Sequence, residues 1–142
     1  MIVISKKLSE TINLGKKLIK KLKGGEIIIL QGDLGAGKTA LVKGMALELG
    51  IKKPVRSPTF NLMRIYTIKK NSKIKKLIHV DCYRLKNTQE IIEIGLLDYL
   101  NQTQTITAIE WPEKISPILK KYKTTKILLE SLGEEKRKIT IK

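Results

Sequence analysis

The stretch Gly32-Asp33-Leu34-Gly35-Ala36-Gly37-Lys38-Thr39 matches the pattern G-x-x-x-x-G-K-[ST]. It follows an apolar run at 27–30, which predicts a buried strand, and it opens a segment with apolar residues at helical spacing. These helical positions are Leu41, Val42, Met45, Ala46 and Leu49. A strand, a glycine-rich loop and a helix in this order are the context in which the pattern predicts a phosphate-binding loop.

The residue types of this loop suit the binding of a nucleoside triphosphate. Glycines let the backbone adopt positive φ, so that successive N–H groups form a concave nest for phosphate oxygens. The N-terminus of the following helix adds partial positive charge. Lys38 is expected to reach the β- and γ-phosphates, and the hydroxyl of Thr39 is expected to bind Mg²⁺. The predicted ATP-binding residues of the loop are Gly35, Ala36, Gly37, Lys38, Thr39 and Ala40.

Length and composition predict one globular α/β domain over residues 1–142. The chain is long enough to bury a core, and 42% of its residues are hydrophobic. Its first residues contain too short an apolar run for a signal peptide, and no run is long enough to span a membrane. Its single cysteine, Cys82, excludes an internal disulfide. We therefore expect a cytoplasmic protein without a membrane partner.

The formal net charge of +16 raises the question of nucleic-acid binding. The chain has 25 lysines but only four arginines, and 22 isoleucines but only four valines. A surface selected to read phosphates or bases favours arginine, and base stacking needs more than 4% aromatic residues. The bias is more typical of a genome with AT-rich codons, so we interpret the charge as a solvated lysine surface.

A helix is predicted between the N-terminus and the strand at 27–30. Apolar residues recur at helical spacing from Ile12 onward, with Ser9 as the expected N-cap, Glu10 in the first turn and Gly24-Gly25 beyond the end. Residues 2–4 predict a short edge strand before this helix.

The connection at 52–60 contains two prolines, which exclude a regular helix. Its length is typical of a functional loop, in which the hydroxyl of Thr59 would meet the γ-phosphate or its metal as in a switch loop. A solvent-exposed loop with a Ser-Pro turn explains the same residues, and the sequence alone leaves both interpretations open.

Two predicted strands end in carboxylates. Residues 61–68 and 75–82 predict an antiparallel hairpin whose second strand ends at Asp81, and the strand at 105–109 leads into Glu110. A carboxylate at the end of an apolar strand is the pattern that holds Mg²⁺ or its water, so Asp81 and Glu110 compete for this role. His79 alternates onto the face of Asp81, where a lone strand histidine is usually structural. Trp111 is either a packing anchor or a marker of the nucleotide surface.

The remaining segments complete the predicted fold. Asn87 or Thr88 caps a short helix, and residues 126–130 and 137–141 predict a final hairpin. A hairpin after the phosphate-loop helix departs from a simple βαβ repeat. The sequence therefore predicts a single-domain P-loop NTPase of the α/β class, with a mixed central sheet and helices on both faces.

Four motifs in this order resemble the TsaE (YjeE) family. They are the phosphate loop, Ser-Pro-Thr-Phe at 57–60, His-Val-Asp-Cys-Tyr-Arg-Leu at 79–85 and Ile-Glu-Trp-Pro-Glu at 109–113. The resemblance covers nearly the whole chain. It implies a weak Mg²⁺-dependent ATPase required for threonylcarbamoylation of adenosine 37 of tRNA. It also implies that TsaD and TsaB are the protein partners, and that tRNA is met indirectly through their complex.

The resemblance also implies roles for individual residues. Lys38, Asp81 and Glu110 match catalytic positions, and Thr39 with Glu110 matches the metal site. Thr11 and Arg137 match positions near the nucleotide base. Thr59 lies in the family's switch-like loop, and Trp111 matches a tryptophan beside the metal.

Two other functions stay open at this stage. A small nucleotide or metabolite kinase would share the phosphate loop, but it would need an acceptor pocket and more arginines than the chain has. An RNA-binding module is suggested by the charge alone.

Overall fold

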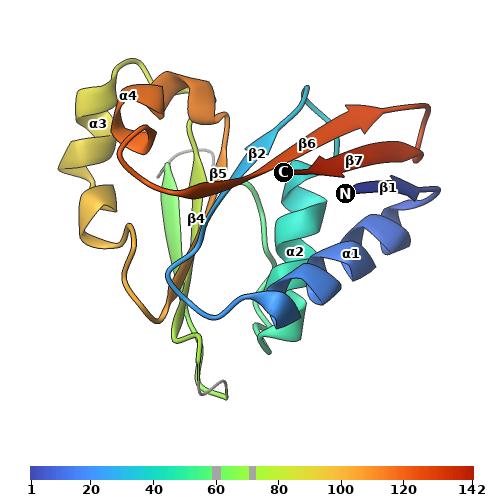
Figure 1. The fold of residues 1–142 in the computed structure, drawn as a ribbon, viewed down its shortest axis with the longest axis horizontal. Helices are drawn as coiled ribbons and strands as arrows, with labels where there is room; N and C mark the ends of the chain where they lie inside the picture. Colours follow the sequence, from blue (N-terminus) through green and yellow to red (C-terminus); the bar gives the residue numbers. More distant parts are fainter. Residues whose placement is uncertain (59–61, 71–72) are drawn as a thin grey trace.

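Seven strands form one mixed sheet in the order β1-β7-β6-β2-β5-β4-β3 (Figure 1). The computed structural model describes residues 1–58, 62–70 and 73–142. Three neighbouring pairs are parallel, namely β2 with β5, β2 with β6, and β4 with β5. The other three pairs are antiparallel, which confirms the predicted mixed sheet. The strands are β1 Ile2–Ser5, β2 Ile27–Gln31, β3 Met63–Thr67, β4 Lys76–Asp81, β5 Thr105–Glu110, β6 Thr124–Ser131 and β7 Arg137–Ile141.

Helices cover both faces of the sheet, as the sequence predicts (Figure 1). Helices α1 and α2 pack on one face, while α3 and α4 lie on the other with two short 3₁₀ turns, η1 and η2. The bounds are α1 Leu8–Lys21, α2 Lys38–Glu48, α3 Thr88–Glu93, η1 Leu96–Asp98, η2 Pro112–Ile115 and α4 Ser116–Leu119. Because both faces are covered, the central strands β2 and β5 are buried on both sides, and β2 is apolar from Ile27 to Leu30.

The N-cap of the first helix lies two residues before the predicted one. The N-cap is Lys7 rather than Ser9, and its side chain makes no capping hydrogen bond. Glu10 instead ties the segment before the helix to its first turn, because its carboxylate accepts a hydrogen bond of 2.7 Å from the backbone N–H of Lys6. The start of α1 is therefore set by the end of β1 and by Glu10 in the first turn, and the prediction of Ser9 as the cap was wrong.

The two long helices meet through glycines. A Cβ on Gly44 of α2 would lie 1.9 Å from the carbonyl oxygen of Ile12, and a Cβ on Gly15 of α1 would lie 2.2 Å from that of Leu41. Only glycine allows the two backbones to approach this closely. The contact brings the first turns of α1 against the start of α2, where the phosphate loop ends.

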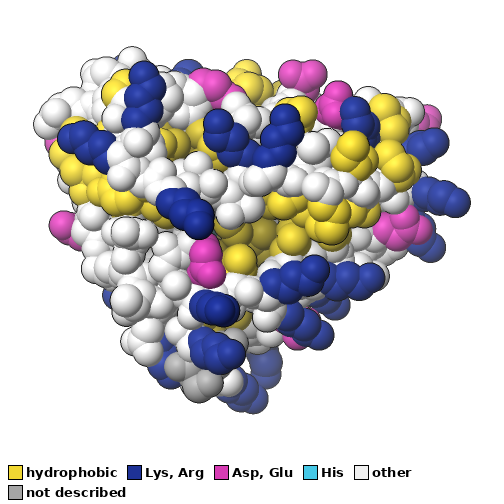
Figure 2. All heavy atoms as spheres, viewed as in Figure 1, with side chains coloured by type: hydrophobic (Ala, Val, Ile, Leu, Met, Phe, Trp, Pro, Cys, Tyr) yellow, Lys and Arg dark blue, Asp and Glu magenta, His cyan; other side chains and the backbone are white. Residues whose placement is uncertain are grey.

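Lysine and arginine side chains are distributed over the protein surface. On the face drawn in Figure 2, lysine and arginine side chains are spread across the surface, with hydrophobic side chains between them. The described cations on that face do not gather into one patch. In the described parts of the chain, no helix is both long and apolar enough to cross a membrane.

Candidate active site

The phosphate loop connects β2 to α2 at the carboxyl edge of the parallel strands. Helix α2 begins at Lys38, and its N-cap, Gly37, has φ of 102°. A residue with a Cβ rarely adopts this conformation, so glycine is required there. The first N–H groups of a helix lack partners within the helix, so this end of α2 is suited to bind an anion.

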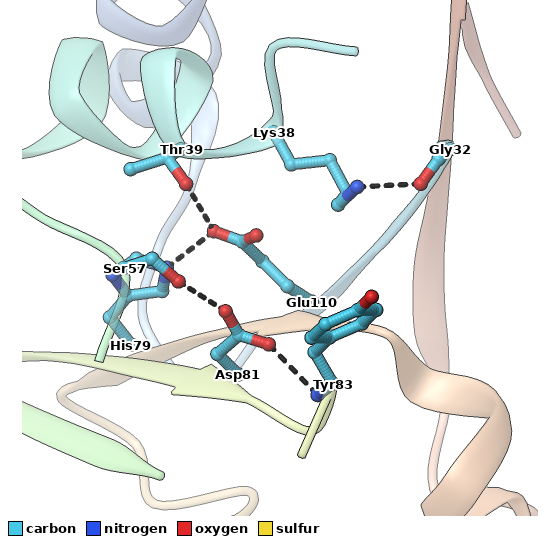
Figure 3. A network of polar contacts seen from close by, with 8 residues as sticks. All are labelled: Gly32, Lys38, Thr39, Ser57, His79, Asp81, Tyr83 and Glu110. Carbon is cyan, nitrogen blue, oxygen red and sulfur yellow. Dashed lines mark hydrogen bonds and ion pairs between the residues drawn. The ribbon is translucent and has the colours of Figure 1, made fainter. Parts of the chain in front are cut away.

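Lys38 is folded back onto its own loop. Its Nζ donates hydrogen bonds to the carbonyl oxygens of Gly32 at 2.5 Å and Asp33 at 2.9 Å (Figure 3). The ammonium also lies 4.4 Å from the centre of the Trp111 ring, and the residue is only 4% exposed. Burial lowers the pKa of Lys38 from its ordinary value, and the nearby carboxylate of Glu110 acts in the opposite direction.

Glu110 is held by groups from two neighbouring elements. Its Oε1 accepts a hydrogen bond of 2.9 Å from the Thr39 hydroxyl, and it lies 2.7 Å from Nε2 of His79 (Figure 3). Glu110 is 3% exposed and His79 is fully buried. The carboxylate at the end of β5 thus reaches across to the phosphate loop, as the sequence predicts for a metal-site residue.

Asp81 lies beside Glu110 but contacts a different segment. The two residues are register partners at the ends of β4 and β5. Oδ2 of Asp81 accepts a hydrogen bond from the Ser57 hydroxyl, and Oδ1 accepts one of 2.9 Å from the backbone N–H of Tyr83 (Figure 3). Asp81 therefore ties the loop after α2 to the sheet. Thr59, the predicted switch residue, lies outside the described residues.

Trp111, the residue after Glu110, covers one side of the site with its ring. Its backbone is in the left-handed region, with φ of 56° and ψ of 55°, which is uncommon for a residue with a Cβ. Its ring lies 5.0 Å from that of Tyr83 and covers the ammonium of Lys38. Local strain of this kind is often found at functional sites.

Thr11 and Arg137 lie on the other side of the phosphate loop. A Cβ built on Gly37 would be 3.6 Å from Cγ2 of Thr11 and 3.9 Å from Nε of Arg137. Arg137 also donates a hydrogen bond of 3.1 Å to the carbonyl oxygen of Gly35. The fold therefore brings both residues from distant segments to the loop, Thr11 from α1 and Arg137 from β7.

Two polar residues of the site were not among the predicted site residues. Ser57 stands in a Ser-Pro pair and opens the motif at 57–60, and His79 opens the motif at 79–85, but the sequence assigns neither residue a role in the site. Alternation along β4 does place His79 on the face of Asp81, but the pattern within one strand does not say which residue of the neighbouring strand it meets.

The oxygens of Thr39, Glu110 and Asp81 fit Mg²⁺ by their chemistry. Hydroxyl and carboxylate oxygens are hard ligands, and Mg²⁺ is usually held by one or two carboxylates together with substrate phosphates. Within residues 1–58, 62–70 and 73–142, no cluster of three or more His, Cys, Asp or Glu side chains forms a metal cage.

The phosphate loop between β2 and α2, with carboxylates at the ends of two adjacent parallel strands, defines an α/β protein of the P-loop class. The crystal structure of Bacillus subtilis YdiB shares this fold, with a TM-score of 0.76 and 28% identity over 99% of this chain and 83% of that one. A model of the family of threonylcarbamoyl adenosine biosynthesis protein TsaE matches residues 5–139. The chain belongs to the TsaE family.

Two relatives match nearly its whole length. The tRNA threonylcarbamoyladenosine biosynthesis protein TsaE of Treponema pallidum is 36% identical over 97% of both chains. The TsaE protein of Aquifex aeolicus is 38% identical over 98% of this chain and 93% of its own. The resemblance stated from the four motifs is thereby confirmed, and it places the protein in tRNA threonylcarbamoyladenosine biosynthesis.

Proposed function

We propose that the protein is a Mg²⁺-dependent ATPase that acts on the TsaD–TsaB complex in tRNA threonylcarbamoyladenosine biosynthesis. The family membership supports the pathway. The observation that carries the ATPase proposal is the hydrogen bond between Thr39 of the phosphate loop and Glu110 of β5. It joins the hydroxyl expected at the metal to a buried carboxylate beside the predicted γ-phosphate position.

The phosphates of ATP would be held by the backbone N–H groups of residues 35–40 and by Lys38. The ammonium of Lys38 is already desolvated and bonded to two carbonyl oxygens, so it would exchange Gly32 and Asp33 for phosphate oxygens over a short distance. This exchange replaces neutral acceptors by charged ones, which form stronger hydrogen bonds. Trp111 above Lys38 keeps bulk water away from the charge.

Thr39 and Glu110 would hold Mg²⁺, which neutralises charge on the phosphates when it is bound. The hydrogen of the Thr39 hydroxyl is donated to Glu110, so the lone pairs of the Thr39 oxygen stay available for the metal. Asp81 is assigned a different task, because its carboxylate holds Ser57 of the loop after α2. We assign Glu110 to the metal and Asp81 to positioning this loop and the attacking water.

Thr11 and Arg137 would border the nucleoside end of ATP. Both lie against Gly37 of the phosphate loop. The guanidinium of Arg137 is fixed by the carbonyl oxygens of Gly35, Gly133, Glu134 and Lys136, so its flat face is held in one orientation.

The test of this function is whether the terminal phosphate goes to water or to another acceptor. We expect purified protein to release inorganic phosphate from ATP slowly and only with Mg²⁺. A panel of nucleosides, nucleotides and small metabolites should not increase consumption of ATP. Transfer of phosphate to one of these acceptors faster than hydrolysis would replace the ATPase by a kinase and leave the phosphate loop unchanged as the binding site.

A further inference from the structure

His79 is a buried polar residue that the proposed ATPase chemistry does not use. It lies on β4, two residues before Asp81, and its exposed fraction is 0%. Nε2 contacts Oε1 of Glu110 at 2.7 Å, whereas Nδ1 has no hydrogen-bond partner among the described residues. Buried polar atoms are nearly always paired, so a histidine in this position needs an explanation.

The contact defines which nitrogen of the ring carries hydrogen. Glu110 as a carboxylate only accepts hydrogen bonds, so Nε2 must be the donor. The atom left unpaired is then the lone pair of Nδ1, and a buried unpaired acceptor is tolerated more often than a buried unpaired N–H group. The hydrogen on Nε2 is therefore directed at Glu110.

We propose that His79 is the positioning residue that fixes the Glu110 carboxylate for Mg²⁺. Oε1 of Glu110 is held on one side by Thr39 and on the other by His79 (Figure 3). Thr39 belongs to the nucleotide-binding loop, whereas His79 belongs to the sheet. The histidine is thus the anchor that is independent of the nucleotide, and Oε2 of Glu110 would remain available to the metal. This inference rests on the proposed function, because it takes Glu110 as a metal ligand.

Hydrogen bonds to a metal-binding side chain from residues that do not bind the metal orient that side chain before the metal binds. Their loss typically lowers metal affinity by about 10–100-fold. In His79→Leu, Glu110 would keep only the Thr39 hydroxyl as a partner and would have to be ordered when the metal binds. We expect the Mg²⁺ concentration for half-maximal binding of a non-hydrolysable ATP analogue to rise about 10-fold or more. His79→Gln, whose amide can donate to the same oxygen, should recover much of this loss.

Binding is followed without turnover by the fluorescence of Trp111, the single tryptophan, which lies 4.4 Å from the Lys38 ammonium. Val80→Ala is the matched control, because Val80 is also fully buried in β4 but packs on the opposite face of the sheet. It should lower the melting temperature and keep the wild-type Mg²⁺ midpoint. A wild-type midpoint in His79→Leu, or equal losses in His79→Leu and His79→Gln, would overturn the proposal.

Glu110→Gln separates this proposal from the function on which it rests. If Glu110→Gln loses the Mg²⁺ response and His79→Leu keeps it, the role of His79 alone fails. If Glu110→Gln also keeps the wild-type midpoint, the metal site itself is misassigned, and the role of His79 fails with it. The single histidine also allows a direct check by ¹⁵N NMR of the wild-type protein. In the wild-type protein we expect the hydrogen on Nε2 and slow exchange of this hydrogen with solvent, and in Glu110→Ala we expect the exchange to become fast. A hydrogen on Nδ1 in the wild-type protein would overturn the proposal.

Discussion

Replacing Glu110 by glutamine and by alanine should separate its chemical role from its structural one. Glutamine keeps the shape of the side chain, and its amide oxygen can accept the hydrogen bonds from Thr39 and His79. Its NH₂ group would then occupy the place of Oε2, where it cannot bind a cation. We expect Glu110→Gln to change the free energy of unfolding by less than about 1 kcal/mol.

Alanine removes both the acceptor and the packing of the side chain. The N–H group of His79 is fully buried and would lose Glu110, its only partner within the described part of the chain, at a cost of about 1–3 kcal/mol. Thr39 is nearer the surface and can turn to water. Relief of the buried negative charge offsets part of the loss, so Glu110→Ala should be destabilised by about 1–3 kcal/mol.

Both substitutions should lower Mg²⁺-dependent hydrolysis by about 10²–10³-fold, since each removes the charge at the metal position. Some nucleotide binding should remain in both, because the loop amides and Lys38 are untouched. Stability is measured by urea unfolding and activity by phosphate release. A wild-type rate in Glu110→Gln would refute the metal assignment. Equal destabilisation of the two variants would refute the hydrogen-bond geometry.

Three further outcomes follow from buried groups. Burial lowers the pKa of Lys38 from 10.5, so between the lowered pKa and 10.5 the unfolded chain binds more protons than the folded chain. In this pH range the free energy of unfolding of the wild type should rise with pH relative to that of Lys38→Met. Parallel curves of unfolding free energy against pH would contradict this. Burial raises the pKa of Cys82 to about 12, so iodoacetamide should label it only after unfolding; rapid labelling of the native chain would contradict its burial. Gly44→Ala should lower the free energy of unfolding by at least about 1 kcal/mol, because the new Cβ would clash with the carbonyl oxygen of Ile12. This loss should outweigh the higher helix propensity of alanine. A raised melting temperature would contradict the close helix contact.

Much of the fold was accessible from local patterns. The apolar runs of β2, β4 and β5 predicted buried strands, and the carboxylates at the ends of β4 and β5 lie where the sequence placed them. The cap of α1 was missed because Ser9 is a good capping residue by type, whereas the end of β1 and Glu10 fix the start of the helix. Contacts outside the helix therefore decide whether α1 is capped at Lys7 or at Ser9.

The proposed division of work between the two carboxylates does not follow from the strand patterns, and only the family resemblance points to Glu110 as the metal ligand. Asp81 and Glu110 are equivalent in pattern, each ending an apolar strand. Their difference comes from what faces them in space, Ser57 in one case and Thr39 with His79 in the other. These partners depend on the register of β4 against β5 and on the path of an irregular loop, and neither leaves a periodic signal.

The central claim is that this chain uses ATP to act on a partner complex. The most direct measurement is Mg²⁺-dependent ATP hydrolysis by the purified protein, alone and with TsaD–TsaB from the same organism, with Glu110→Gln as the inactive control. Slow hydrolysis that increases when the pair is added, and that is absent in Glu110→Gln, is predicted. Hydrolysis that is unchanged by the pair, or that is equal in Glu110→Gln, would contradict the account.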